Sequence, residues 1–167
     1  MKFNFSAFKA IYFHEMDRFR RTLMQSLLSP VLSTSLYFIV FGSVIGGYVE
    51  KIDGISYGSY IVPGLLMLTL LTQSITNTSF GIFFPKFNGT IYEILAAPIS
   101  TLEIVLAFVG AGATKTLIVG VVIFITANFF VEVDVKYPFL VIFLLILVAF
   151  TFALFGFLIG LMSSDFE

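Results

Sequence analysis

The stretch from Pro85 to Glu103, PKFNGTIYEILAAPISTLE, separates the second and third of four long apolar runs in this 167-residue chain. It contains the pattern S/T-x-x-E twice, beginning at Thr90 and at Ser100. In this pattern the hydroxyl accepts a hydrogen bond from the backbone N–H three residues on, and the glutamate reaches back to the capping residue. Both positions are therefore predicted helix starts.

The first of these helices is expected to be about two turns long, because Pro98 disfavours helical geometry at the residue before it. The second opens the next membrane-length helix. The stretch thus predicts a short, ordered helix held between two long ones, which makes it a suitable contact for a partner. The apolar side of this short helix, which is expected to rest on other parts of the protein, consists of Ile91, Ile94 and Leu95.

Hydrophobic residues make up 59% of the chain and charged residues 11%, against roughly 45–50% and 25% in soluble domains. This composition predicts an integral membrane protein without a soluble catalytic domain. The chain has no cysteine and a single histidine, His14, which excludes thiolate metal sites and argues against a histidine-built site. The spans carry no paired carboxylates, so we expect no catalytic residue and no metal. The formal net charge of -1 says little about partners, and no nucleic-acid partner is expected.

Each of the four apolar runs is long enough to cross a hydrocarbon core of roughly 30 Å as a helix. The runs lack strict alternation and exceed the about 11 residues of a barrel strand. The expected fold class is therefore an all-α polytopic membrane protein, with a transmembrane domain over residues 30–162. The predicted spans are residues 31–49, 60–84, 104–131 and 138–162.

Residues 1–29 form a segment with an apolar and a charged side, which predicts an amphipathic helix lying in the membrane interface. A helix packed on a soluble partner is the alternative. The apolar positions, spaced by three and four, are Phe5, Phe8, Tyr12, Met16, Phe19, Leu23 and Leu27. The opposite side carries His14, Asp17, Arg18 and Arg21.

The basic residues are distributed unevenly over the predicted connections. The positive-inside rule places the N-terminus and the loop at residues 85–103 in the cytoplasm, and four spans return residues 163–167 to the same side. The outer connections carry only Lys51 and Lys136. The cytoplasmic side carries Lys2, Lys9, Arg18, Arg20, Arg21 and Lys86.

Polar residues inside the spans are candidates for function. One face of the second span carries Thr69, Thr72, Gln73, Thr76 and Asn77. This face either makes hydrogen bonds between helices or forms a surface for a substrate or a dimer axis. Lys115, inside the third span, requires a partner or an aqueous route unless it snorkels to the interface. Pairs of glycines with the spacing of close helix contacts occur at Gly42 and Gly46 and at Gly156 and Gly160.

Taken in order, several segments resemble the membrane subunit of a type-2 ABC exporter, and especially the small bacterial permeases encoded beside a separate ATPase. These segments are Phe19-Arg20-Arg21, Ser29-Pro30-Val31, residues 37–42 (YFIVFG), 60–67 (YIVPGLLM), 76–80 (TNTSF), 86–93 (KFNGTIYE) and 95–100 (LAAPIS). The resemblance covers essentially the whole chain. Members of this family usually have six spans, so the four here are expected to be the first four, with a truncation at residues 163–167.

The resemblance implies roles for particular residues. It makes residues 88–98 a coupling helix that docks on a cytoplasmic ABC ATPase subunit, through Asn88, Gly89, Thr90, Tyr92, Glu93, Leu95 and Pro98. It makes residues 5–28 a connecting helix that touches the same subunit near Arg18, Phe19, Arg20 and Arg21. The candidates for the translocation path, between two permease copies in a homodimer, are Thr69, Thr72, Gln73, Thr76, Asn77 and Lys115.

The function expected from the resemblance is a permease subunit of an ABC exporter in the bacterial inner membrane. It would couple ATP hydrolysis by a separate subunit to export of an amphipathic, lipid-linked, polysaccharide or drug-like solute. The chain has no Walker A sequence, so ATP and Mg²⁺ are expected on the partner and no cofactor on this chain. The alternatives are an ATP-independent carrier or channel, disfavoured by the lack of acidic residues in the spans, and a scaffold without a transport role.

Overall fold

The computed structural model describes residues 4–45, 51–52, 54–131 and 135–163. Four helical stretches in it are long and apolar enough to cross a membrane, and an additional helix precedes them. This confirms the predicted fold class. The elements in order are α1 (Phe5–Arg21), α2 (Leu23–Tyr37), the π-helical segment η1 (Phe38–Ile45), β1 (Lys51–Ile52), β2 (Ile55–Ser56), α3 (Tyr57–Phe87), α4 (Ile91–Ala96), α5 (Thr101–Phe130) and α6 (Pro138–Met162).

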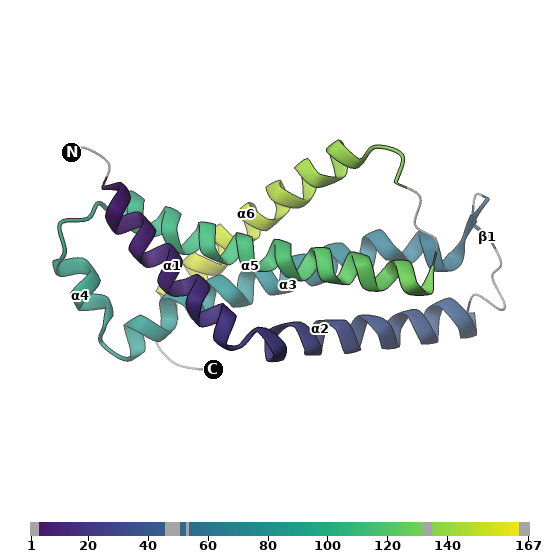
Figure 1. The fold of residues 1–167 in the computed structure, drawn as a ribbon, viewed down its shortest axis with the longest axis horizontal. Helices are drawn as coiled ribbons and strands as arrows, with labels where there is room; N and C mark the ends of the chain where they lie inside the picture. The colour runs from purple at the N-terminus through teal and green to yellow at the C-terminus, as the bar shows by residue number, and fades with distance from the viewer. Residues whose placement is uncertain (1–3, 46–50, 53, 132–134, 164–167) are drawn as a thin grey trace.

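The long helices run roughly along one axis, and the two ends of the molecule differ (Figure 1). The start of α1, the short helix α4 and the end of α6 lie together at one end. The antiparallel pair formed by β1 and β2 lies at the other end, with Lys51 opposite Ser56. The arrangement agrees with a chain that crosses a membrane four times and returns to its starting side.

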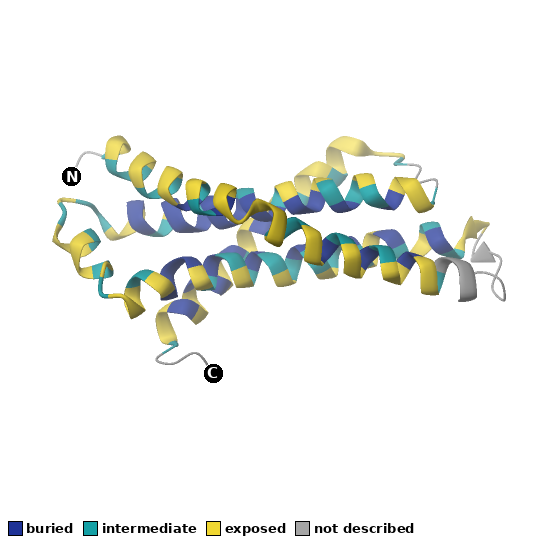
Figure 2. Ribbon diagram, turned by 60° about the horizontal axis from the view of Figure 1, so that its bottom comes forward, coloured by how far each residue is buried: buried dark blue, intermediate teal, exposed yellow. Residues whose placement is uncertain are grey.

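Helix α5 forms the centre of the bundle and contacts α1, α2, α3 and α6. Small residues such as Ala107, Ala111 and Gly112 are fully buried along it, which lets neighbouring helices approach closely. Figure 2 shows the buried residues concentrated where the long helices face one another. The largest apolar cluster comprises Ile82, Ile104, Phe108, Val109, Ala113, Ala149, Ala153 and Phe157.

Helices α3 and α6 cross at two glycines. A Cβ built on Gly156 would lie 2.5 Å from the carbonyl oxygen of Ile75, and one on Gly160 would lie 2.6 Å from the carbonyl oxygen of Ser79. Glycine is needed because the backbones touch, which confirms the close contact predicted from the glycine spacing. The Ser74 hydroxyl adds a hydrogen bond of 3.0 Å to the carbonyl of Ala149. In the other predicted pair, Gly42 and Gly46, the second glycine lies outside the described residues.

The N-terminal segment does not form one continuous helix, because the helix is interrupted at Thr22. The Thr22 hydroxyl donates to the carbonyls of Arg18 at 3.2 Å and Phe19 at 3.3 Å, and its backbone leaves helical geometry. Helix α2 then begins at Leu23 and continues through Pro30, so the first membrane stretch starts earlier than the predicted residue 31. Residues 46–49 of the predicted span lie outside the described residues.

The second span is also longer than predicted, because α3 runs from Tyr57 to Phe87. Its start is capped by Ser56, whose hydroxyl accepts a hydrogen bond from the Ser59 backbone at 3.2 Å. Pro85 therefore lies in the last turn of α3 and does not separate the two helices. Near this end the Lys86 ammonium donates to the carbonyls of Leu161 at 2.8 Å and Ser163 at 2.7 Å, which satisfies the C-terminus of α6.

Candidate functional site

The connection from α3 to α4 is a tight turn built on a glycine. The Asn88 backbone N–H closes the last turn of α3 by donating to the carbonyl of Phe84 at 3.0 Å. Gly89 follows with a φ of 77°, in the left-handed region that side chains with a Cβ disfavour. This turn ends α3 and fixes where α4 begins.

The two predicted capping boxes have different outcomes. At Ser100 the box is present, since its hydroxyl accepts from the Glu103 N–H at 3.3 Å and the Glu103 carboxylate accepts from the Ser100 N–H at 2.8 Å. At Thr90 the helix begins as predicted, since Thr90 is the N-cap of α4, but the capping hydrogen bonds are absent. The Thr90 backbone is helical, whereas a capping side chain needs an extended backbone, and its hydroxyl donates to the carbonyl of Pro85 at 3.3 Å instead.

Helix α4 rests on the protein on one side and is open on the other. Ile91 and Ile94 are half-buried and pack against the main apolar cluster, as predicted. Leu95 is 62% exposed and Tyr92 is 73% exposed, so the expectation that Leu95 also packs inward is wrong. Of the seven predicted coupling residues, all except the half-buried Gly89 are exposed at this end: Asn88, Thr90, Tyr92, Glu93, Leu95 and Pro98.

Helix α1 lies along α5 and is fixed to it at several levels. The Asn4 backbone N–H donates to the Glu103 carboxylate at the start of α5. Further along, the Tyr12 hydroxyl donates to the Thr114 hydroxyl at 2.9 Å. Phe19 is buried in a small cluster with Val119 and Ile123. Part of the apolar side predicted to face lipid therefore packs against the bundle.

The residues of α1 that are predicted to contact the ATPase subunit divide between buried and exposed positions. Phe19 is buried, Arg18 is half-exposed, and Arg20 and Arg21 are exposed. Phe5 is 60% exposed although it belongs to the predicted apolar side. The basic side chains of Arg20 and Arg21 remain available to lipid or to a partner.

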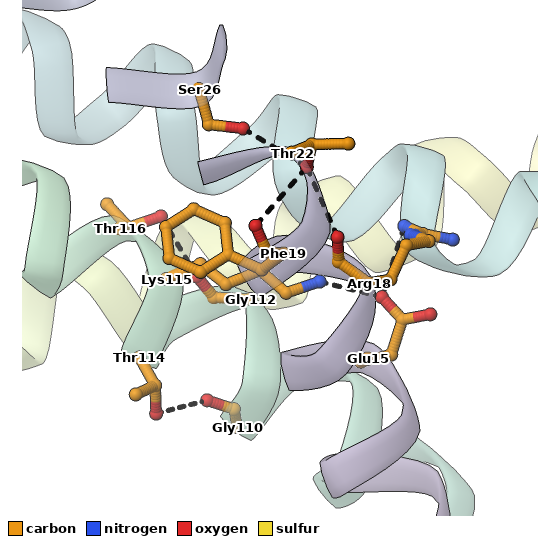
Figure 3. A network of polar contacts seen from close by, with 10 residues as sticks. All are labelled: Glu15, Arg18, Phe19, Thr22, Ser26, Gly110, Gly112, Thr114, Lys115 and Thr116. Atoms are coloured by element: carbon orange, nitrogen blue, oxygen red, sulfur yellow. Dashed lines mark hydrogen bonds and ion pairs between the residues drawn. The ribbon is translucent and has the colours of Figure 1, made fainter. Parts of the chain in front are cut away.

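Lys115 is paired inside the bundle with Glu15 of α1. The Lys115 ammonium lies 2.7 Å from the Glu15 carboxylate oxygen Oε2, and both side chains are almost fully buried. The Arg18 guanidinium lies 3.1 Å from the same oxygen. Figure 3 shows these three charged groups converging between the two helices.

Sequence reasoning identified the need for a partner of Lys115 but missed Glu15. The available signal was the position of Glu15 between Tyr12 and Phe19, three and four residues away, which puts a carboxylate on the apolar side of an amphipathic helix. A buried charge is stable only when it is paired. A carboxylate and an ammonium that are each misplaced in an apolar setting therefore suggest each other.

The polar face of α3 borders a groove of about 270 Å³ against α2. Thr69, Thr72 and Gln73 line it, whereas Thr76, Asn77 and Lys115 are not among its lining residues. The hydroxyls of Thr69 and Thr72 donate to carbonyls of their own helix, at 2.8 Å and 2.9 Å. From α2 the groove receives Ser29, Pro30, Ser33, Thr34 and Tyr37.

A bundle of four apolar helices, with a short exposed helix at one end and a groove between two of the long helices, defines a polytopic membrane protein. The chain belongs to the ABC-2 type transporter family, whose profile matches residues 6–167.

Similar proteins include the inner membrane transport permease YadH of Escherichia coli strain K12 and of Shigella flexneri. Each is 37% identical over 161 residues, which cover 96% of this chain and 63% of the relative. The chain therefore spans less than two thirds of the length of these relatives. No solved structure matches it significantly.

Proposed function

We propose that this chain forms the permease part of an ABC exporter and couples to ATP hydrolysis on a separate cytoplasmic subunit. The observation that carries the proposal is the construction of α4. It is a short helix whose Tyr92 and Leu95 side chains are exposed, while its ends are held by the turn at Gly89 and the capping box at Ser100. An exposed apolar surface on a rigidly held helix is typical of a docking site.

Motion of α4 would reach the bundle through short connections. On one side, few residues separate α4 from the end of α3, and on the other the Ser100 capping box begins α5. Helix α1 would move with α5, because the ion pair of Glu15 and Lys115 and the contacts of Phe19 hold the two together. Closure of two ATPase subunits around ATP would then displace α1, α4 and α5 as one rigid body.

The translocation path is proposed along the polar side of α3, at the interface of a homodimer. Thr69, Thr72 and Gln73 supply hydroxyl and amide groups to the groove against α2, and Thr76 and Asn77 continue the face beyond it. These groups suit the polar part of an amphipathic, lipid-linked, polysaccharide or drug-like solute. Lys115 lies apart from the groove, so its contribution to transport is proposed to pass through α1.

The proposed location is a bacterial inner membrane, like that named for YadH, with α4 and the start of α1 in the cytoplasm. The chain has no native cysteine, so single cysteines report the orientation directly. In this orientation a Leu95→Cys variant reacts with an impermeant maleimide only in inside-out vesicles. An Ile55→Cys variant, in β2 at the opposite end, reacts only in spheroplasts. The reverse labelling pattern would show that the orientation in the membrane is opposite to the proposed one.

Coupling is tested by purifying the tagged protein from its native host in mild detergent. We expect an ABC ATPase subunit to co-purify with the wild-type protein, and Tyr92→Ala to reduce its recovery about tenfold, as for a hot-spot aromatic residue. Tyr137→Ala is the matched control, because Tyr137 is also an exposed aromatic residue but precedes α6, away from α4. Wild-type protein without an ATPase, and transport that persists without one, would instead support an ion-driven carrier.

A further inference from the structure

A pocket of about 350 Å³ lies between α1, α4 and α5, beside the end of α3. It is separate from the polar groove and lies at the end of the molecule that carries α4. Its walls combine apolar and titratable side chains from helices distant in sequence, including Ile11, His14, Glu15, Glu93, Ile94 and Phe108.

Glu15 contributes a buried acceptor to this pocket. The side chain is 2% exposed, and its Oε2 receives both Lys115 and Arg18. The other oxygen, Oε1, is buried and has no hydrogen-bond partner among the described residues. Figure 3 shows this oxygen pointing away from Lys115. A buried acceptor without a donor is costly, and a ligand that brings an N–H group would remove that cost.

Glu93 supplies a second carboxylate at the rim. It is exposed, and its side chain makes no ion pair or hydrogen bond within the part of the chain that the structure describes. Lys115 and Arg18 are not among the lining residues, so they approach Glu15 from outside the pocket. Among the described residues, the pocket is therefore lined by one unpaired carboxylate at its rim and by Glu15, whose buried Oε1 lacks a donor, between apolar walls.

We propose that this pocket receives an arginine side chain of the cytoplasmic ATPase subunit. The inference rests on the proposed function and adds the chemistry of the contact. The apolar stem of arginine suits Ile11, Ile94 and Phe108, and its planar fork of five N–H donors can serve two acceptors at once. Lysine, a compact point charge, fits this pair of acceptors less well. Because the pocket joins α1 to α4, the inserted side chain binds both helices together.

The test compares variants of the tagged full chain by the amount of ATPase subunit that co-purifies with each from the native host. Glu93→Gln removes the rim charge, and Ala10→Trp fills the pocket from α1 without changing any charge. Both are expected to lower the recovered ATPase about tenfold or more, as for loss of a desolvated charge contact. Lys136→Gln and Asn128→Trp are the matched controls for charge and bulk, since both residues are exposed beside the end of α5, away from α4, and should leave recovery within about twofold.

A photo-crosslinking residue at position 10 identifies the occupant. The expected adduct is an ATPase peptide containing arginine. Replacing that arginine of the ATPase by glutamate should restore binding to a Glu93→Arg variant of this chain. An adduct with phospholipid alone, or wild-type recovery by Glu93→Gln, would overturn the proposal. Failure of the wild-type chain to recover any ATPase defeats the proposed function itself, so the two failures are distinguishable.

Discussion

The buried ion pair between α1 and α5 makes a quantitative prediction about stability. Replacing Glu15 or Lys115 by methionine, an unbranched apolar residue, removes one charge and leaves the other buried. The two single variants should differ, because only Glu15 has a second cation nearby. Arg18 lies 3.1 Å from the Glu15 carboxylate, whereas Lys115 has no other acidic partner among the described residues.

The magnitudes follow from burial. The Lys115 side chain is 4% exposed, so Glu15→Met strands a charge away from water and should cost about 3–5 kcal/mol of unfolding free energy. Lys115→Met leaves Glu15 with Arg18 and should cost about 1–3 kcal/mol. The double variant places two apolar side chains in contact and should lie within about 1 kcal/mol of wild type. Arg18→Met, at a half-exposed position, should cost less than about 1 kcal/mol.

The measurement is reversible unfolding in mixed micelles, titrated with sodium dodecyl sulfate and followed by circular dichroism. The wild type, Glu15→Met, Lys115→Met and the double variant form a double-mutant cycle, from which we expect a coupling energy of at least about 3 kcal/mol between Glu15 and Lys115. Arg18→Met serves as the control for loss of a charge near the pair. Costs of Glu15→Met and Lys115→Met that simply add in the double variant would refute the pairing.

Two further predictions concern the backbone. Gly156→Ala should destabilise the bundle by about 1–3 kcal/mol in the same titration, because its Cβ would lie 2.8 Å from the Cα of Ile75; Gly64→Ala is the control, since a Cβ there meets nothing within 4 Å. Ser100→Ala should cost about 1 kcal/mol through loss of the capping box, and Thr90→Val, whose hydroxyl makes no cap, should cost less than half as much. Equal costs within either pair would contradict the geometry.

The capping residues show where local sequence reasoning succeeds. The pattern at Ser100 is complete within four residues, so it predicted the start of α5 correctly. The same pattern at Thr90 predicted the start of α4 correctly, but no capping box forms there, because α3 extends to Phe87 and Thr90 has a helical backbone. An identical local pattern therefore had two outcomes, decided by where the preceding helix ended.

The polar face of α3 shows the corresponding limit for packing. Helical spacing placed Thr69, Thr72 and Gln73 on one face, and the structure puts all three beside the same groove. Helical spacing could not identify Ser74 as the residue that forms a hydrogen bond to α6, because that depends on which face of α3 meets Ala149. Periodicity assigns residues to a face, but the neighbour of that face is a tertiary property.

The sequence by itself determined the membrane class, the approximate spans and the short helix between the second and third of them. These features depend on runs of apolar residues and on hydrogen bonds between near neighbours. Only the tertiary structure decided that α1 lies against α5 and that Lys115 meets Glu15, a residue 100 positions away. A buried charge must find its partner wherever packing brings one, so the pairing depends on how the helices pack against one another.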